Sequence, residues 1–214
     1  MPDAPDPGLA ARLRDGTREA HRAAERGPFV RAFLRATIDR ATYRAYLDAL
    51  WPVYAALEAG LQRHRAHPVA GPLALPALYR APAIAADLRE LFVAAAADAP
   101  PVPAAAAYAA HLRGLADADP ALLVAHAYTR YLGDLSGGQI LRGAAARILG
   151  VPPSGPGLAL YDFPEVADLG ACKVDLRARL DALPVDPAGA AALVAEARSA
   201  FARNAAIFSE LMPS

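Results

Sequence analysis

The segment Tyr128–Leu141, YTRYLGDLSGGQIL, decides how the rest of this sequence is interpreted. It carries Gly133, Gly137 and Gly138, and apolar residues flank it at helical spacing. Each glycine costs a helix about 1 kcal/mol relative to alanine. A chain that keeps this loss is expected to gain something from bare backbone, either a bend or the close approach of a flat ligand. Taken alone, however, the segment slightly favours a plain turn between two helices with a solvated Asp134.

The flanks of this segment predict one helix over residues 120–149. Asp119 supplies an N-cap side chain, and Pro120 stands at the first helical position, where proline is well tolerated. Downstream, apolar residues recur every three or four positions up to Gly150, a residue type that often ends helices. On this pattern the glycines lie within a helix and not between two helices.

Composition favours an all-α fold. The chain has 214 residues, of which 55% are hydrophobic, and many of these are alanine, the strongest helix former. No stretch alternates apolar and polar residues with β-branched enrichment, so the sequence predicts no strands. We find no internal repeat, and the length suits one domain with a sizeable core. We therefore expect a disordered tail over residues 1–8 and a single compact helical bundle over residues 9–211.

Prolines and N-cap residues divide the chain into expected helices. These cover residues 9–25, a short segment after Pro28, a longer segment that Asp39 caps and that reaches Leu61, and residues 87–97, 104–115, 120–149, 164–183 and 187–211. Pro52 falls within the long helix after Asp39 and should kink it or split it. Residues 68–82 and 151–157 are expected to be connecting segments.

Charge and cysteine content exclude several classes of function. Lys+Arg and Asp+Glu are both 22, so no overall attraction to nucleic acid is expected. Cys172 is the only cysteine, which excludes an intramolecular disulfide and suits a reducing cytoplasm. The acidic, proline-rich start is unlike a signal peptide, and Pro100, Pro101 and Pro103 break the most alanine-rich region, so no membrane span is predicted. We expect a soluble, cytoplasmic protein, taken as a monomer.

His21 is the first candidate for cofactor chemistry. It lies at the edge of the apolar stripe of the first helix, where a lone histidine is more often structural than a ligand. Arg14 lies within about 20° of the same helix face and about 10 Å away along the axis. An imidazole and a fixed cation at this spacing suit a metallated macrocycle that bears carboxylates, with the nitrogen binding iron and the guanidinium meeting a propionate. Alone, Arg14 fits a solvated surface charge better.

Other candidates are weaker by themselves. Lys173 and Arg177 form an i,i+4 pair of like charge, which costs roughly a few tenths of a kcal/mol unless an anion or solvent screens it. A mixed-charge surface is the more common explanation for such a pair. Tyr54 and Tyr128 are phenols on apolar helices, where core packing with one hydrogen bond is more common than catalysis. Structural or solvated roles are expected for His64, His67, His126 and Cys172.

Several segments together resemble the haem oxygenase family. YLGDLSGGQ at 131–139 is similar to that family's distal-helix signature and is highly specific. LRDGTREAHRAAE at 13–25 is similar to the proximal-helix segment and places His21 at the position of the axial ligand. YDFPEVADLGACKVDLRARL at 161–180 resembles the propionate-contacting helix, and AFARNAAIF at 200–208 resembles the last helix. The resemblance runs from about Leu9 to Leu211 and is weakest between Pro68 and Pro103.

The resemblance implies a soluble bacterial enzyme with haem, both substrate and cofactor, sandwiched between the helix of His21 and a glycine-kinked helix. Asp134 would order a water that supplies a proton to the reacting dioxygen, with Tyr54 and Arg130 holding the water network. An external electron donor, such as ferredoxin or a reductase, would be required. The products would be biliverdin, ferrous iron and carbon monoxide, with the α meso carbon as the default position and a reductase or bacterial phytochrome as a possible acceptor of biliverdin. The implied haem-binding residues are Arg14, His21, Tyr128, Gly133, Gly137, Gly138, Lys173, Arg177, Phe201 and Asn204.

Two alternatives stay open on the sequence. A non-catalytic haem carrier on the same scaffold would need His21 but not Asp134. A non-haem relative, such as a di-iron oxidase or a thiamin-degrading hydrolase, would need several Glu and His ligands on facing helices or a nucleophile in a pocket, and the expected helices lack a Glu-x-x-His motif. No motif encodes the bilin isomer, the electron donor, or whether the reaction serves iron recovery or pigment supply.

Overall fold

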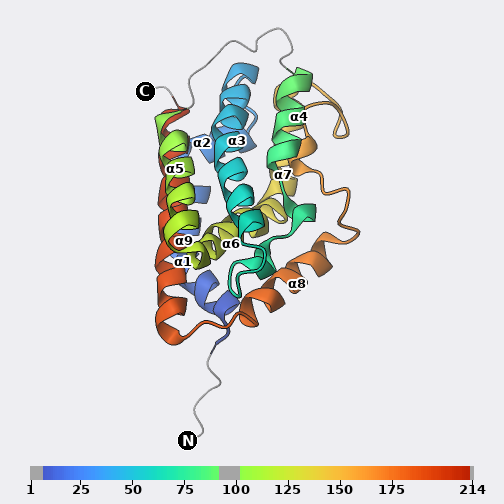
Figure 1. Ribbon diagram of the computed structural model, residues 1–214. Helices are drawn as coiled ribbons and strands as arrows, with labels where there is room; N and C mark the ends of the chain where they lie inside the picture. Colours follow the sequence, from blue (N-terminus) through green and yellow to red (C-terminus); the bar gives the residue numbers. More distant parts are fainter. Residues whose placement is uncertain (1–6, 92–101, 213–214) are drawn as a thin grey trace, which may run out of the picture.

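The computed structural model describes residues 7–91 and 102–212. Within these ranges the chain forms helices and turns without a β-strand (Figure 1), which confirms the all-α prediction. The helices are α1 (Leu9–Glu25), α2 (Pro28–Leu34), α3 (Arg40–Arg63), α4 (Ala81–Leu91), α5 (Pro103–Ala118), α6 (Leu123–Asp134), α7 (Gly137–Leu149), α8 (Leu169–Asp181) and α9 (Pro187–Glu210). Single 3₁₀ turns cover Gly71–Leu73, Pro76–Leu78, Pro120–Leu122 and Ala159–Tyr161. The expected tail lies outside the described residues except for positions 7 and 8.

Short acidic side chains set several helix boundaries where the sequence predicts them. Asp39 accepts a hydrogen bond from the Thr42 backbone N–H (2.8 Å) at the start of α3. Asp186 does the same for Gly189 (2.7 Å) at the start of α9. At the other end of α7, Gly150 adopts the left-handed conformation (φ 68°, ψ 34°) that stops a helix at low steric cost.

Two expected helix starts are wrong. The helix predicted over residues 164–183 begins only at Leu169, because Asp168 caps it by accepting from the N–H groups of Gly170 and Ala171. The helix predicted from Asp87 begins instead at Ala81, and what was predicted beyond Leu91 falls outside the described residues. Of the two effects expected of Pro52, a kink or a split, the split does not occur, because α3 is continuous from Arg40 to Arg63.

The single helix predicted over residues 120–149 is also wrong. A 3₁₀ turn precedes α6, and α6 and α7 are separate helices that meet at Leu135 and Ser136. Gly133 lies in the last turn of α6, whereas Gly137 and Gly138 open α7. The chain turns at Ser136, which leaves the helical region (φ −115°, ψ −80°), next to the buried Leu135. The glycines therefore flank a break in the helix.

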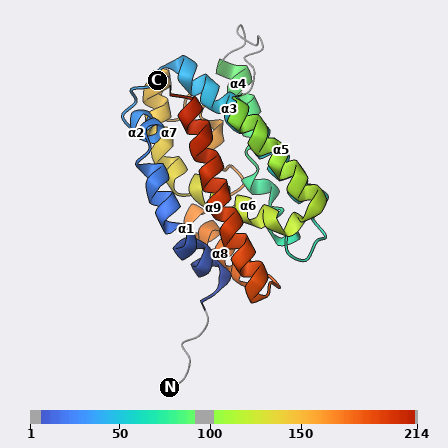
Figure 2. The ribbon, with the colours of Figure 1, turned by 90° about the vertical axis from the view of Figure 1, so that its left-hand side faces the viewer.

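Helix α9 organises the packing of the bundle. It lies against α1, α5 and α6, and Figure 2 shows it in front with α1 on one side and α5 on the other. Helix α3 packs along α5 and also contacts α4 and α6. The largest fully buried side chains include Tyr43, Tyr54, Tyr108, Tyr131 and Phe33, with leucines of α3 around them. Burial of each leucine contributes about 1.5–3 kcal/mol, so this tyrosine-rich core holds the helices that carry the candidate site in fixed positions.

No helix within residues 7–91 and 102–212 is long and apolar enough to span a membrane.

Candidate functional site

A carboxylate and a phenol form the centre of the candidate site. The hydroxyl of Tyr54, on α3, lies 2.7 and 2.9 Å from the two carboxylate oxygens of Asp134, at the end of α6, and donates its hydrogen to them. Tyr54 is buried, so this contact is fixed by the packing of α3 against α6. Residues 80 positions apart in the sequence thus share one hydrogen bond.

Arg130 closes the other side of this pair. Its guanidinium carbon lies 5.1 Å from the ring centroid of Tyr54 and 5.6 Å from that of Tyr108, and its Nη2 donates to Oδ1 of Asn204 on α9. Burial acts to lower the pKa of Arg130, but the phenols of Tyr54 and Tyr108 and the carboxylate of Asp134 raise it overall. The side chain is therefore a fixed cation. Its Nε has no hydrogen-bond partner among the described residues, which leaves one buried donor available.

The environment of Asp134 brings the pKa of its carboxyl close to neutral. Burial raises the pKa of this carboxyl from its ordinary value of 3.8 to about 6, although the hydrogen bond from Tyr54 and the charges of Arg130 and Arg80 act to lower it. A carboxyl that titrates close to neutral pH can both hold and release a proton during a reaction. Of the residues that the sequence singled out, Asp134, Tyr54, Arg130 and Asn204 form one network.

This network makes stability depend on pH in a direction that can be measured. The folded chain holds a proton on Asp134 between about pH 4 and pH 6 that the unfolded chain has lost, so stability should fall as pH rises through this window. Above it, the ionised, partly buried carboxylate costs about 1–3 kcal/mol. We expect Asp134→Asn to be more stable than the parent by this amount at pH 7.5 and nearly equal to it at pH 4, as measured by urea unfolding. Equal stabilities at pH 7.5 would contradict the raised pKa.

The glycines beside Asp134 differ in their surroundings. Beyond the chain neighbours and the backbone of its own helix, a Cβ atom built on Gly133 or on Gly137 would meet no heavy atom of the described residues within 4 Å, and both glycines are exposed. Gly138 is buried, and a Cβ atom built on it would lie 3.8 Å from the Tyr161 ring. The side-chain amide of Gln139 donates to the backbone carbonyl of Tyr161 (2.9 Å). Bare backbone at Gly133 and Gly137 therefore borders open space next to the carboxylate.

His21 lies on α1 with its side chain 56% exposed. Its ring makes an edge contact with Phe201 of α9 (centroids 5.8 Å apart, 76° between planes), so these two predicted residues lie together. Its Nδ1 lies 3.6 Å from a carboxylate oxygen of Glu25, one helical turn later. An Nδ1–H turned toward that carboxylate would leave Nε2 as a free metal ligand. Sequence reasoning missed Glu25, although the i,i+4 spacing signals it.

Two of the predicted basic residues, Arg14 on α1 and Arg177 on α8, act electrostatically on Tyr128 of α6. Burial raises the pKa of Tyr128, while the hydroxyl of Thr17 and the charges of Arg177 and Arg14 act to lower it, which places both arginines within electrostatic reach of this phenol. Arg14 also forms an ion pair with Asp15 (Nε–Oδ1 3.0 Å). Arg177 donates to the backbone carbonyl of Lys173 (3.3 Å).

Two residues that sequence reasoning missed complete the surroundings of Asp134. Tyr108, on α5, lies beneath Arg130, and its hydroxyl is 2.8 Å from Nδ1 of His126. Arg80 is buried, stacks 4.0 Å from the Phe163 ring centroid and acts to lower the pKa of Asp134. Neither stands in a recognisable motif, because both reach the site only through the packing of distant helices.

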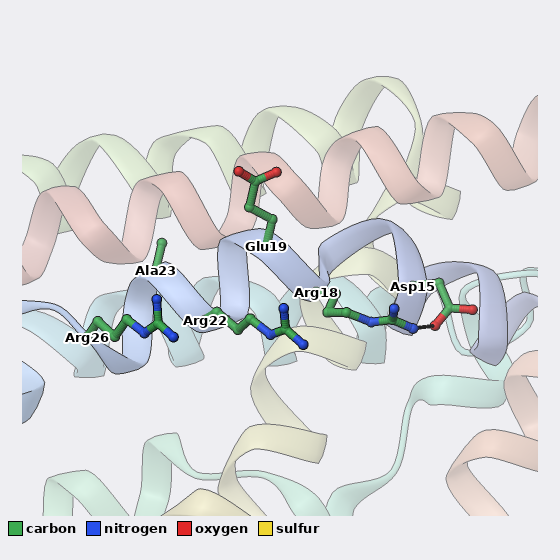
Figure 3. A pocket seen from close by; sticks show the side chains of 6 residues that line it. All are labelled: Asp15, Arg18, Glu19, Arg22, Ala23 and Arg26. Carbon is green, nitrogen blue, oxygen red and sulfur yellow. Dashed lines mark hydrogen bonds and ion pairs between the residues drawn. The ribbon is translucent and has the colours of Figure 1, made fainter.

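The outer surface of α1 carries a shallow depression lined by Asp15, Arg18, Glu19, Arg22, Ala23 and Arg26. Figure 3 shows that Arg18, Arg22 and Arg26 follow one another along one side of the helix, whereas Glu19 points away from them. Arg18 donates to Asp15, but neither Arg22 nor Arg26 has a carboxylate partner within the described part of the chain. This side of α1 therefore presents a row of positive charge.

Comparison with known proteins gives a consistent result along the whole chain. The model of the family described as "Heme oxygenase" matches residues 7–210. A haem oxygenase of Guillardia theta is 40% identical over 95% of this chain and 86% of its own length. Haem oxygenase 1 of a Nostoc strain is 37% identical over 95% of this chain and 85% of its own length.

Solved structures agree with the sequence comparisons. Haem oxygenase from Leptospira interrogans superposes with a TM-score of 0.89 at 39% identity, covering 95% of this chain and all of the other. Haem oxygenase-1 from a Synechocystis strain, solved in complex with haem, superposes with a TM-score of 0.90 at 37% identity, covering 96% of this chain and 92% of the other. The resemblance seen in individual segments of the sequence thus extends to the path of nearly the whole backbone.

Proposed function

Because this chain belongs to the haem oxygenase family and is a haem-degrading enzyme, we propose that it opens haem at the α meso carbon to give biliverdin, ferrous iron and carbon monoxide. The observation that carries the proposal is the position of Asp134. A carboxyl with a pKa of about 6 is held by Tyr54 beside the open backbone of Gly133 and Gly137.

The residues present fit haem as the substrate. Backbone without side chains at Gly133 and Gly137 leaves room for the flat face of a porphyrin, since nothing described lies within 4 Å of either Cβ position. When bound, haem supplies both the iron at which dioxygen is reduced and the ring that is oxidised. His21, with an exposed imidazole on α1, would ligate the iron from the opposite face, and Phe201 would hold the imidazole plane.

The positive groups around Tyr128 suit the two propionates of haem. Arg14 and Arg177 both act on the pKa of Tyr128, and Lys173 lies one turn before Arg177 on α8. Guanidinium groups bind carboxylates through paired hydrogen bonds, so these helices can set the rotation of the ring and hence the meso carbon that faces the reaction. Arg14 would exchange its contact with Asp15 for a propionate.

On the distal side, we assign Asp134 the role of ordering a water and passing a proton through it to the reacting dioxygen. Tyr54 holds the carboxylate by donating to it, and Arg130, fixed by Asn204, supplies a nearby positive charge and a free Nε–H for the water network. A haem carrier would need His21 but no network of this kind, so the buried arrangement around Asp134 favours the enzyme.

The decisive experiment is turnover. The purified chain, loaded with one equivalent of ferric haem and given an electron donor in air, should lose the haem absorption band and yield a green tetrapyrrole whose isomer chromatography identifies as α. A haem band that persists under these conditions would favour the carrier. A different biliverdin isomer would support the enzyme but contradict the proposed seating of the propionates.

The proposed contact between haem and the backbone of Gly133 can be tested by haem binding alone, without turnover. Gly133→Ala should stabilise the haem-free fold by about 0.5–1 kcal/mol, because the new methyl group enters open space and alanine favours the helix. The same methyl group should weaken haem binding by at least about tenfold if the porphyrin lies against this backbone, as measured by absorption titration. Gly114→Ala, at an exposed and equally open position on α5, is the matched control and should gain stability without loss of haem affinity. Unchanged haem binding in Gly133→Ala would contradict the proposed seating.

We further propose that the electron donor is an acidic protein that docks on the arginine row of α1. Arg22 and Arg26 are exposed and lie on the helix that carries His21, which gives electrons a short route to the iron. Arg22→Glu combined with Arg26→Glu should slow haem reduction by a ferredoxin about tenfold or more at low salt, and the difference should shrink at high salt. Arg113→Glu, an exposed arginine on α5, is the charge-matched control. Equal reduction rates for both variants would place the donor elsewhere.

A further inference from the structure

Two histidines and a glutamate meet where α5, α6 and α9 pack together. The Nε2 atoms of His111 and His126 lie 2.7 and 2.9 Å from the same carboxylate oxygen of Glu196. The ligand atoms of all three residues lie within 4.8 Å of one another. His126 is fully buried, whereas the side chains of His111 and Glu196 are 24% and 15% exposed. The cluster is therefore rigid on its inner side and reachable from solvent on its outer side.

The residue types of the cluster suit a metal ligand set. Two imidazole nitrogens and one carboxylate oxygen face one another, and these are ligand atoms that divalent transition metals take in proteins.

Tyr108 supplies the outer contact that a metal-bound histidine usually has. Its hydroxyl lies 2.8 Å from Nδ1 of His126, on the side of the ring away from Glu196. With Nε2 on a metal, His126 would carry its proton on Nδ1 and donate it to the Tyr108 oxygen, and this contact would fix the plane of the ring. The hydroxyl changes from donor to acceptor without any movement of the helices.

We propose that His111, His126 and Glu196 bind a divalent transition-metal ion, with water completing the coordination. Two imidazoles and one carboxylate are ligands of intermediate softness that suit zinc, and they also suit ferrous iron when further coordination positions are open. Magnesium and calcium prefer sites made of oxygen ligands and are not expected here. Metal–ligand bonds of about 2.0–2.2 Å in a tetrahedral site separate neighbouring ligand atoms by about 3.3 Å. The two Nε2 atoms now lie 2.7 and 2.9 Å from the Glu196 oxygen. Small rotations of the His111 and Glu196 side chains, which are on the accessible side, would widen these distances to the value that a metal site needs.

This site is distinct from the haem site proposed above and does not depend on it. Tyr108 and Arg130 stand between the cluster and Asp134: the Tyr108 hydroxyl meets His126, while its ring faces the guanidinium of Arg130. The other pair of neighbouring histidines is unsuited to the same role. Nε2 of His64 is hydrogen-bonded to the Ala116 carbonyl, and Nδ1 of His67 accepts from the backbone N–H groups of Val69 and Ala70.

The test is calorimetric titration of the full-length, metal-stripped and haem-free chain with zinc chloride at pH 7.5. His21→Ala serves as the background, because its exposed imidazole could bind zinc independently. We expect one zinc ion per chain and a rise in Tm of about 5 °C when free zinc exceeds Kd by 100-fold. Cobalt(II) should bind competitively and give the visible absorption of a site with two nitrogen ligands.

The variants decide whether the bound ion is at this cluster. His111→Ala and Glu196→Gln, both on the accessible side, should each raise the zinc Kd by about 100-fold or more, while far-UV circular dichroism and thermal unfolding without zinc confirm the fold. His64→Ala should leave Kd within threefold. No zinc binding below millimolar concentration, or a Kd in His111→Ala within threefold of the background, would overturn the proposal. If zinc does not bind, Glu196 serves only as a hydrogen-bond acceptor for the two histidines.

Discussion

Asp134→Ala should lower the rate of biliverdin formation by about 10²–10⁴-fold while haem still binds with an affinity within a few-fold of the parent. The carboxylate lies in the hydrogen-bond network of Tyr54 and Arg130, so its removal takes away the proton-transfer group and leaves the proposed iron ligand in place. Haem affinity is measured by absorption titration, and the product is measured by chromatography after turnover with a fixed electron donor.

Two further variants separate proton transfer from water binding. Asp134→Asn keeps the shape and the contact with Tyr54 but cannot exchange a proton at neutral pH, so its rate should be nearly as low as that of Asp134→Ala. Tyr54→Phe removes only the hydroxyl that holds the carboxylate, and should lower the rate by a smaller factor, about tenfold. The parent rate should also decline as pH falls below about 6, where the carboxylate becomes protonated. An unchanged biliverdin yield in Asp134→Ala would rule out the proton-transfer role.

His21→Ala is expected to abolish turnover and to change the absorption spectrum of bound ferric haem. The imidazole on α1 would be the only bond from the protein to the iron, so the variant should bind haem more weakly by roughly tenfold or more and with a different spin state. Added imidazole should restore the parent spectrum, because the methyl side chain of alanine leaves space for it beside Phe201.

The controls for His21 address the possibility that the variant merely loosens α1. Glu25→Gln keeps the ligand but weakens the negative charge near Nδ1, and should change the spectrum of the ferric complex less than loss of the histidine does. His64→Ala removes a histidine whose Nε2 bonds to the backbone, and should leave the haem spectrum unchanged. If His21→Ala binds and degrades haem like the parent, the ligand is another residue.

Helix boundaries could be predicted from the sequence where a short polar residue or glycine determines them. Asp39, Asp186 and Gly150 act through backbone contacts within four residues, so their effect is encoded locally. The break between α6 and α7 agrees with the turn that the glycine-rich segment favours by itself, whereas the apolar pattern of its flanks predicts one continuous helix. Local pattern did not decide between the two. Nor did it decide whether Pro52 would interrupt α3, which is unbroken.

The chemistry of the site divides in the same way. The segments at 131–139 and 13–25 were sufficient to identify the family, because they resemble its distal and proximal helix segments and the family model matches residues 7–210. The pKa of Asp134 follows instead from Tyr54 and Arg130, and from burial that no local pattern contains.

The sequence by itself determined an all-helical chain and the helix caps at Asp39, Gly150 and Asp186, since these depend on backbone preferences within one helix. Its motifs also supplied a family-specific set of candidate residues. Only the tertiary structure decided that Tyr54 meets Asp134, that Tyr108 joins Arg130 to His126, and that His111 and His126 converge on Glu196. These contacts join helices that are distant in the chain. Their distances and burial arise from packing, and packing sets the proton affinity of each group.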